Sequence, residues 1–127
     1  MLISKALSYD SFGLPREVVK LIQREHSTPE EGEVQLRILA APIHPSDFGI
    51  ILGKYGTLPT LPAIGGREGV AEIVNIGPNV RDLTIGDRVL VPKEVGAWQT
   101  SAVCSAKGLF RLPSDIPLEM AAMATIN

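Results

Sequence analysis

The chain has 127 residues, of which 45% are hydrophobic and 20% are charged, and its formal net charge is −2. This length suffices for one domain with a buried core, and the composition is typical of a soluble globular protein. The charges form no basic stripe, which argues against nucleic acid as a partner, and no apolar run approaches the ~20 residues of a membrane span.

Alternation of apolar and polar residues predicts a chain built mainly from short strands. In the first of them Ile3, Leu7 and Tyr9 lie on one side, so we expect that face to be buried. Polar and acidic residues then predict a solvated loop over 24–32 that carries an exposed His26. The expected strands span residues 1–9, 18–22, 33–41, 69–76, 97–103 and 109–111, with one more that ends before Pro92.

The chain is organised around residues 43–69, where Pro and Gly punctuate a short apolar run and polar groups cluster. A segment of this kind between strands is typical of a functional loop held by a β scaffold. Pro45 suits the first position of a short helix over 45–52, and Gly53 would end it. Strands with regular turns and little helix together indicate an all-β barrel or sandwich.

No internal repeat, low-complexity tract or linker divides the chain, so we expect one domain over residues 1–127. A C-terminal helix is predicted to start within residues 114–119, with Asp115 or Ser114 as its cap, and to continue from Leu118 to Ile126.

The sequence contains no phosphate-binding loop of its own. The glycines within 53–56 and 65–69 do not have the spacing of G-x-G-x-x-G or of a P-loop. A catalytic zinc needs about three convergent ligands, and no spacing ties His44, Glu68 and Cys104 together, so we expect no metal. As the single cysteine, Cys104 excludes an internal disulfide and fits a reducing compartment, and we expect it to be a small core residue.

Tyr55 stands in a loop between Gly53 and Gly56. An exposed phenol in such a loop can donate a hydrogen bond or a proton to a substrate oxygen. The alternative is a tyrosine that packs its ring and leaves its hydroxyl in water. Structural alternatives also apply to its neighbours: Ser46 and Asp47 as helix-start residues, Arg67 with Glu68 as an ordinary ion pair, and Trp98 as a core or loop anchor.

Four motifs point to a known family: residues 43–47 (IHPSD), 65–71 (GGREGVA), 76–80 (IGPNV) and 85–89 (IGDRV). With them the chain resembles, over nearly its whole length, the GroES-like N-terminal domain of the medium-chain dehydrogenase/reductases. The resemblance implies a mainly β, partly open barrel with short helices. Zinc alcohol dehydrogenases of this superfamily keep a cysteine at the place of His44 and a histidine at the place of Arg67. Both are replaced here, so the chain resembles the zinc-free branch.

Further segments are most similar to mitochondrial-type trans-2-enoyl thioester reductases: residues 45–47, 53–59 (GKYGTLP), 61–66 (LPAIGG), 96–100 (GAWQT) and 112–117 (LPSDIP). This resemblance implies that Tyr55 is the proton donor. It would protonate the α-carbon, or stabilise the enolate oxygen, after NADPH gives hydride to the β-carbon. Two residues depart from the family. The family usually has asparagine at the place of His44, and it often has asparagine at the place of Arg67.

The resemblance also implies a cleft, a cofactor and partners. The expected cleft residues beside Tyr55 are His44, Pro45, Ser46, Asp47, Arg67, Glu68 and Trp98, and Asn127 is expected at the nicotinamide side. The family binds NADPH mainly on a Rossmann domain that follows the helix near Pro117, so we expect the cofactor domain to be missing. The expected partners are a 2-enoyl thioester or a quinone, that domain, and a second copy of the chain. The expected location is the cytoplasm, or the mitochondrial matrix in a eukaryote.

Two other functions remain open. A quinone oxidoreductase-type domain would share the fold and reduce quinones or small electrophilic alkenes, and Tyr55→Phe would separate the two activities. A non-catalytic β-barrel binding or assembly module is a different class, because a fold alone does not determine function. Oxidation of NADPH by the chain, alone or with a partner, would distinguish an enzyme from such a module.

Overall fold

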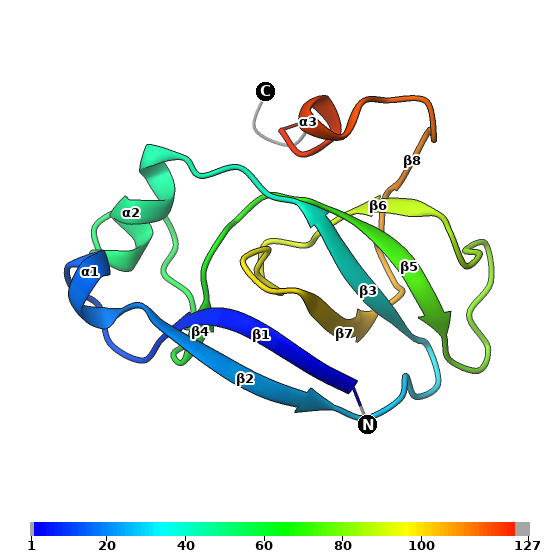
Figure 1. The fold of residues 1–127 in the computed structure, drawn as a ribbon, viewed down its shortest axis with the longest axis horizontal. Helices are drawn as coiled ribbons and strands as arrows, with labels where there is room; N and C mark the ends of the chain where they lie inside the picture. The colour runs from blue at the N-terminus through cyan, green and yellow to red at the C-terminus, as the bar shows by residue number, and fades with distance from the viewer. Residues whose placement is uncertain (1, 124–127) are drawn as a thin grey trace.

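The computed structural model describes residues 2–123 of the chain. Among these residues, strands form two antiparallel sheets, with three short helices beside them (Figure 1). The smaller sheet has the order β2-β1-β4 and consists of β1 (Leu2–Tyr9), β2 (Lys20–His26) and β4 (Ala63–Ile64). The larger sheet has the order β7-β3-β5-β6-β8 and consists of β3 (Glu33–Ala40), β5 (Val70–Ile76), β6 (Arg88–Leu90), β7 (Ser101–Ser105) and β8 (Arg111–Leu112). The helices are α1 (Pro15–Val18), α2 (Pro45–Ile51) and α3 (Leu118–Ala121).

The two sheets meet at the segment that precedes β7. The N–H of Leu7 in the smaller sheet donates to the Trp98 carbonyl at 2.9 Å, and the N–H of Ile38 in the larger sheet donates to the Thr100 carbonyl at 3.1 Å. Over residues 2–123 the two sheets do not close into one barrel. The expected mainly β, partly open architecture is confirmed.

The largest group of core residues lies against the larger sheet. β3 contributes Val34 and Leu36 and β5 contributes Ala71 and Ile73, all at 0% exposure. The alternation predicted for β3 is confirmed, since residues two apart point to the same face of a strand. Burying a side chain of the size of Val, Leu or Ile stabilises the fold by about 1.5–3 kcal/mol relative to leaving it exposed. This layer therefore gives the connecting loops a rigid base.

β1 confirms the first predicted strand but buries the opposite face. Ile3 is 60% exposed and Leu7 is 37% exposed, whereas Ser4 and Ala6 are buried, and only Tyr9 of the expected face is inside. The prediction that Ile3 and Leu7 face the core was therefore wrong. The reason is the close approach of the sheets, because the Ser4 hydroxyl donates to a β7 carbonyl at 2.7 Å and only small side chains fit there.

β2 extends further than predicted and includes Arg24–His26, which we expected in a loop. Its pairing with β1 runs from Ser8↔Lys20 to Leu2↔His26, so β1 draws this polar segment into the sheet. Within the described part of the chain β2 is an edge strand, with a neighbouring strand along one edge only, and its other edge is open to water. Such a strand tolerates polar side chains. His26 is consequently half-buried rather than exposed, and its Nε2 is buried without a hydrogen-bond partner.

This burial predicts a pH dependence of stability. Burial, together with the positive charge of Arg24, lowers the pKa of His26 below its ordinary value of 6.5. As the pH falls below that value, the unfolded chain binds a proton that the folded chain does not, so stability decreases with falling pH. We expect melting temperatures at pH 7.5 and 5.5 to differ more for the wild type than for His26→Gln, which cannot titrate. Equal differences would contradict the prediction.

The other ends of the strands and helices differ from the predicted ones mainly near the C-terminus. β7 begins at Ser101 rather than at residue 97, because the N–H groups of residues 97 and 98 bond to the carbonyls of Gly66 and Gly65. α3 has Pro117 as its N-cap residue rather than Ser114 or Asp115, and it ends at Ala121. Residues 124–126 of the predicted helix lie outside the described residues. No helix of residues 2–123 is long and apolar enough to cross a membrane.

Candidate active site

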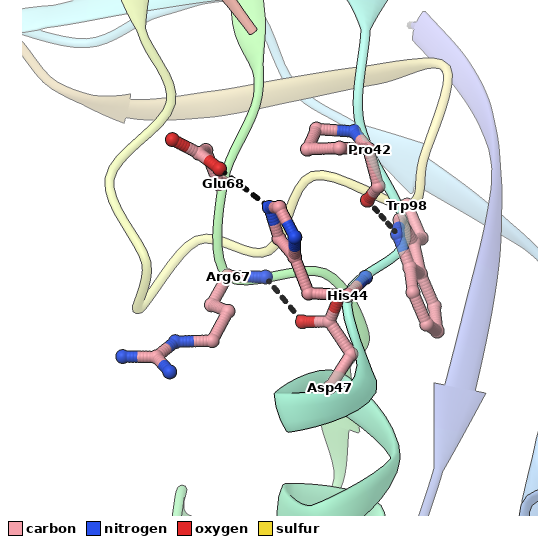
Figure 2. Close-up of polar contacts among 6 residues, drawn as sticks. All are labelled: Pro42, His44, Asp47, Arg67, Glu68 and Trp98. Atoms are coloured by element: carbon pink, nitrogen blue, oxygen red, sulfur yellow. Dashed lines mark hydrogen bonds and ion pairs between the residues drawn. The ribbon is translucent and has the colours of Figure 1, made fainter. Parts of the chain in front are cut away.

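The start of α2 forms one side of the candidate site. Pro45 occupies the beginning of the helix as predicted, where its missing N–H costs no hydrogen bond. Asp47 is buried, and its carboxylate accepts the N–H of His44 at 2.8 Å and the N–H of Arg67 at 3.2 Å (Figure 2). Asp47 is thus the helix-start residue that we expected, and it also joins α2 to residues 65–69, which precede β5.

A second connection joins the same two segments. His44 Nε2 lies 2.7 Å from Glu68 Oε2, and the Glu68 side chain is fully buried while that of His44 is 20% exposed (Figure 2). Arg67 extends away from Glu68, so the structural alternative of an ordinary Arg67–Glu68 ion pair does not hold. Successive residues of an extended segment point in opposite directions, which explains why these two neighbours have different partners.

Arg67 instead faces Tyr55. Its Cζ atom lies 5.6 Å from the centroid of the Tyr55 ring, a distance typical of a cation–π contact. The Tyr55 side chain packs against α2 at Gly49, where an added Cβ would lie 2.9 Å from the Tyr55 Cβ. Tyr55 is nevertheless 49% exposed. The structure therefore places this phenol between α2 and Arg67, within reach of water and solutes.

Trp98 packs against the backbone of Gly65 and Gly66, at the start of residues 65–69. A Cβ on Gly65 or Gly66 would lie 2.3 Å or 2.4 Å from atoms of its indole ring, so the ring lies directly against the glycine backbone. Its Nε1 donates to the Pro42 carbonyl at 3.4 Å (Figure 2). These contacts agree with the structural alternative of Trp98 as a loop anchor, and the glycine pair is required for them. The role of Trp98 as a cleft residue remains a prediction.

These contacts bring most of the predicted site residues together. The residues linked by direct contacts are His44, Asp47, Tyr55, Arg67 and Glu68. Pro45 and Ser46 lie in the first turn of α2, and Trp98 packs on the loop. Asn127 lies outside the described residues.

An apolar groove beside Trp98 was not predicted. It has a volume of about 760 Å³, and its lining includes Leu7, Leu21, Ile43 and Phe48, all partly exposed. Leu7 and Leu21 are cross-strand neighbours on the outer face of the smaller sheet. The alternation of β1 did group its apolar residues on one face, but it could not indicate that this face is the outer one.

Cys104 lies in β7 and packs against the main core, as expected for a small core residue. Burial, together with the negative charges of Glu33 and Glu94, raises the pKa of its thiol to about 11. Since the thiolate is the reactive form, we expect alkylation by iodoacetamide at pH 8 to be about 100-fold slower than for a free cysteine. The chain unfolded in urea provides the control rate, and similar folded and unfolded rates would contradict this prediction.

Among the described residues, no group of three or more His, Cys, Asp or Glu side chains could hold a metal ion. His44 and Glu68 contact each other, whereas Cys104 lies in a strand of the larger sheet. The prediction that the protein uses no zinc remains a prediction.

Residues 30–114 match the family model of the alcohol dehydrogenase GroES-like domain. The chain belongs to this family. It is 46% identical over 124 residues to the mitochondrial enoyl-[acyl-carrier-protein] reductase of Homo sapiens, a match that covers 97% of this chain and 33% of the human protein. The GroES-like domain described here therefore spans about a third of that relative's length. The resemblance to mitochondrial enoyl thioester reductases noted from the motifs is confirmed.

Solved structures agree with this assignment. The domain matches the Etr1p/NADP/crotonyl-CoA complex with a TM-score of 0.92 and 26% identity, over 99% of this chain and 41% of that one. It also matches a putative NADPH:quinone reductase from Bacillus thuringiensis with a TM-score of 0.85 and 34% identity, over 96% of this chain and 37% of that one. The GroES-like fold is thus shared with proteins whose names refer to two kinds of substrate.

Proposed function

We propose that residues 1–127 are the substrate domain of an NADPH-dependent, zinc-independent reductase of 2-enoyl thioesters, with Tyr55 as the proton donor. The observation that carries the proposal is the Arg67 guanidinium over the ring of an exposed Tyr55. The similarity to enoyl thioester reductases over nearly the whole chain supports the substrate class. In a eukaryote the relatives' names favour the mitochondrial matrix as the location, and otherwise we propose the cytoplasm.

The proposed chemistry requires a donor beside a developing negative charge. Reduction at the β-carbon of an enoyl thioester moves charge towards the thioester oxygen, and a hydrogen-bond donor placed there lowers the barrier by several kcal/mol. The Tyr55 hydroxyl supplies that donor or passes its proton to the α-carbon. The phenolate left behind faces the positive charge of Arg67, which stabilises it. We assign His44, Pro45, Ser46 and Trp98 to the surrounding walls of the proposed cleft, with the buried side chains of Asp47 and Glu68 behind them.

The chain's own residues do not fit the whole of NADPH. The sequence has no glycine-rich phosphate loop, so the pyrophosphate lacks its usual helix N-terminus here. We therefore assign NADPH mainly to a cofactor-binding domain outside residues 1–127, with Asn127 beside the nicotinamide. When bound, the cofactor supplies the hydride that reaches the β-carbon.

Titration of NADPH into the 127-residue chain, with cofactor fluorescence as the readout of binding, tests whether the cofactor site lies outside these residues. Addition of a 2-enoyl thioester then tests for turnover. We expect neither binding nor oxidation by the chain alone, and oxidation once the cofactor-binding domain is supplied. Tight binding by the chain alone would contradict the assignment of the cofactor site, and no thioester reduction by the reconstituted protein would contradict the function.

A quinone reductase is the second candidate function. The 34% identity to the putative NADPH:quinone reductase of Bacillus thuringiensis favours it. Two-electron reduction of a quinone does not need a proton delivered to carbon. Comparison of the two activities in a Tyr55→Phe variant therefore separates these candidates.

Self-association of the isolated chain is expected from its surface. Leu21 is 69% exposed and Ile43 is 67% exposed, and both line the apolar groove beside Trp98. Exposed apolar surface of this kind favours contacts that remove it from water. Light scattering over a concentration series should show dimers or larger species, and Leu21→Lys should reduce them. A strictly monomeric wild type would contradict this prediction.

A further inference from the structure

Two connections hold residues 65–69 against the start of α2, one on each side of the Arg67 backbone. The Asp47 carboxylate accepts the Arg67 N–H at 3.2 Å, and the next residue, Glu68, bonds His44 through its side chain at 2.7 Å (Figure 2). Tyr55 packs on the same helix at Gly49. The helix thus supports the phenol, the loop carries the guanidinium, and the two connections determine their relative position.

We propose that His44 and Glu68 are positioning residues that keep the Arg67 guanidinium over the Tyr55 ring. Neither side chain acts on the substrate in this role. The catalytic importance of the Tyr55–Arg67 contact rests on the proposed function, whereas its dependence on His44 and Glu68 does not. The structural effect can be measured on the chain without any turnover.

Burial makes the His44–Glu68 bond a strong constraint. The Glu68 side chain is fully buried, and a buried carboxylate that loses a hydrogen-bonding partner pays a large desolvation cost. We therefore expect removal of the imidazole to shift the loop or to admit water beside the carboxylate. Arg67 immediately precedes Glu68, so its backbone moves with any such shift, and its guanidinium leaves the ring.

The test is nuclear Overhauser contact between the Arg67 side chain and the Tyr55 ring in the 127-residue chain. We expect His44→Ala to lose these contacts and His44→Gln to retain them, because a glutamine amide has an N–H donor at similar reach. Arg37→Gln serves as a matched control, because it removes an exposed ion pair with Glu72 on the larger sheet and should change nothing at Tyr55.

Retention of the contacts in folded His44→Ala, or their loss in His44→Gln, overturns the proposal. If His44→Ala does not fold, His44→Asn decides, because its amide is too short to reach Glu68 and the contacts must be lost. In the active protein we expect His44→Ala to lower kcat about 10–100-fold with KM within about twofold. Absence of thioester reduction in the wild type would refute the proposed function and leave the contact measurement valid.

Discussion

Tyr55→Phe is expected to lower the rate of 2-enoyl thioester reduction by about 10²–10⁴-fold, the usual contribution of a positioned general acid. The substitution removes only a hydroxyl group. Because Tyr55 is 49% exposed, the melting temperature should change little. Steady-state oxidation of NADPH by the protein that includes the cofactor-binding domain measures the rate, with a quinone as the second substrate.

The second tyrosine of the chain provides the matched control. Tyr9 is 3% exposed and its ring packs near Phe12, so its hydroxyl is buried, whereas that of Tyr55 belongs to an exposed side chain. Tyr9→Phe should leave the thioester rate within about twofold, because the side chain that it changes is buried and does not contact solutes. A thioester rate in Tyr55→Phe close to that of the wild type would remove Tyr55 from the mechanism. A loss of both thioester and quinone reduction would point to a role in binding instead.

Gly66→Ala is expected to have the largest effect on stability, a loss of about 2–5 kcal/mol. Two costs add at this position. The backbone has φ +87°, which disfavours any residue with a Cβ, and the new Cβ would lie 2.4 Å from Cδ1 of Trp98. Relief requires Trp98 to move, which also breaks its bond to the Pro42 carbonyl. Urea unfolding followed by tryptophan fluorescence measures both the stability and the environment of the ring.

Gly86→Ala separates the two costs. Gly86 has φ +98°, and an added Cβ there would meet no atom within 4 Å, so only the backbone cost of about 1–2 kcal/mol applies. In a Trp98→Ala background the contact with the indole is gone, and Gly66→Ala should cost no more than Gly86→Ala. Because Trp98 is the single tryptophan of the chain, circular dichroism monitors urea unfolding in that background. If the two glycine substitutions are equally destabilising in the wild-type background, the contact with Trp98 contributes nothing.

Local features of the chain could be read from the sequence because they depend on neighbouring residues. The alternation of β3 predicted that Val34 and Leu36 share a buried face, and Pro45 predicted where α2 begins. Gly53 follows α2 with φ +79°, a conformation that glycine adopts easily. The family motifs in residues 43–47 and 65–71 likewise predicted the fold and the segments that meet at the site.

Contacts between distant residues could not be predicted in this way, because they depend on packing in three dimensions. The sequence established the alternation of β1, but only the approach of the second sheet decided that Ser4 and Ala6 point inward and Leu7 outward. The adjacency of Arg67 and Glu68 suggested an ion pair between them, but Arg67 faces Tyr55 and Glu68 contacts His44.

The sequence by itself therefore determined the strand-rich fold, the ends of α2 and the identity of the residues around Tyr55. The tertiary structure decided which of them touch. His44 meets Glu68 across 24 positions of sequence, and Arg67 meets Tyr55 across a loop. The physical reason is that backbone propensity and side-chain periodicity act over a few residues, whereas burial of a carboxylate or packing of a ring is settled only when the whole chain is folded.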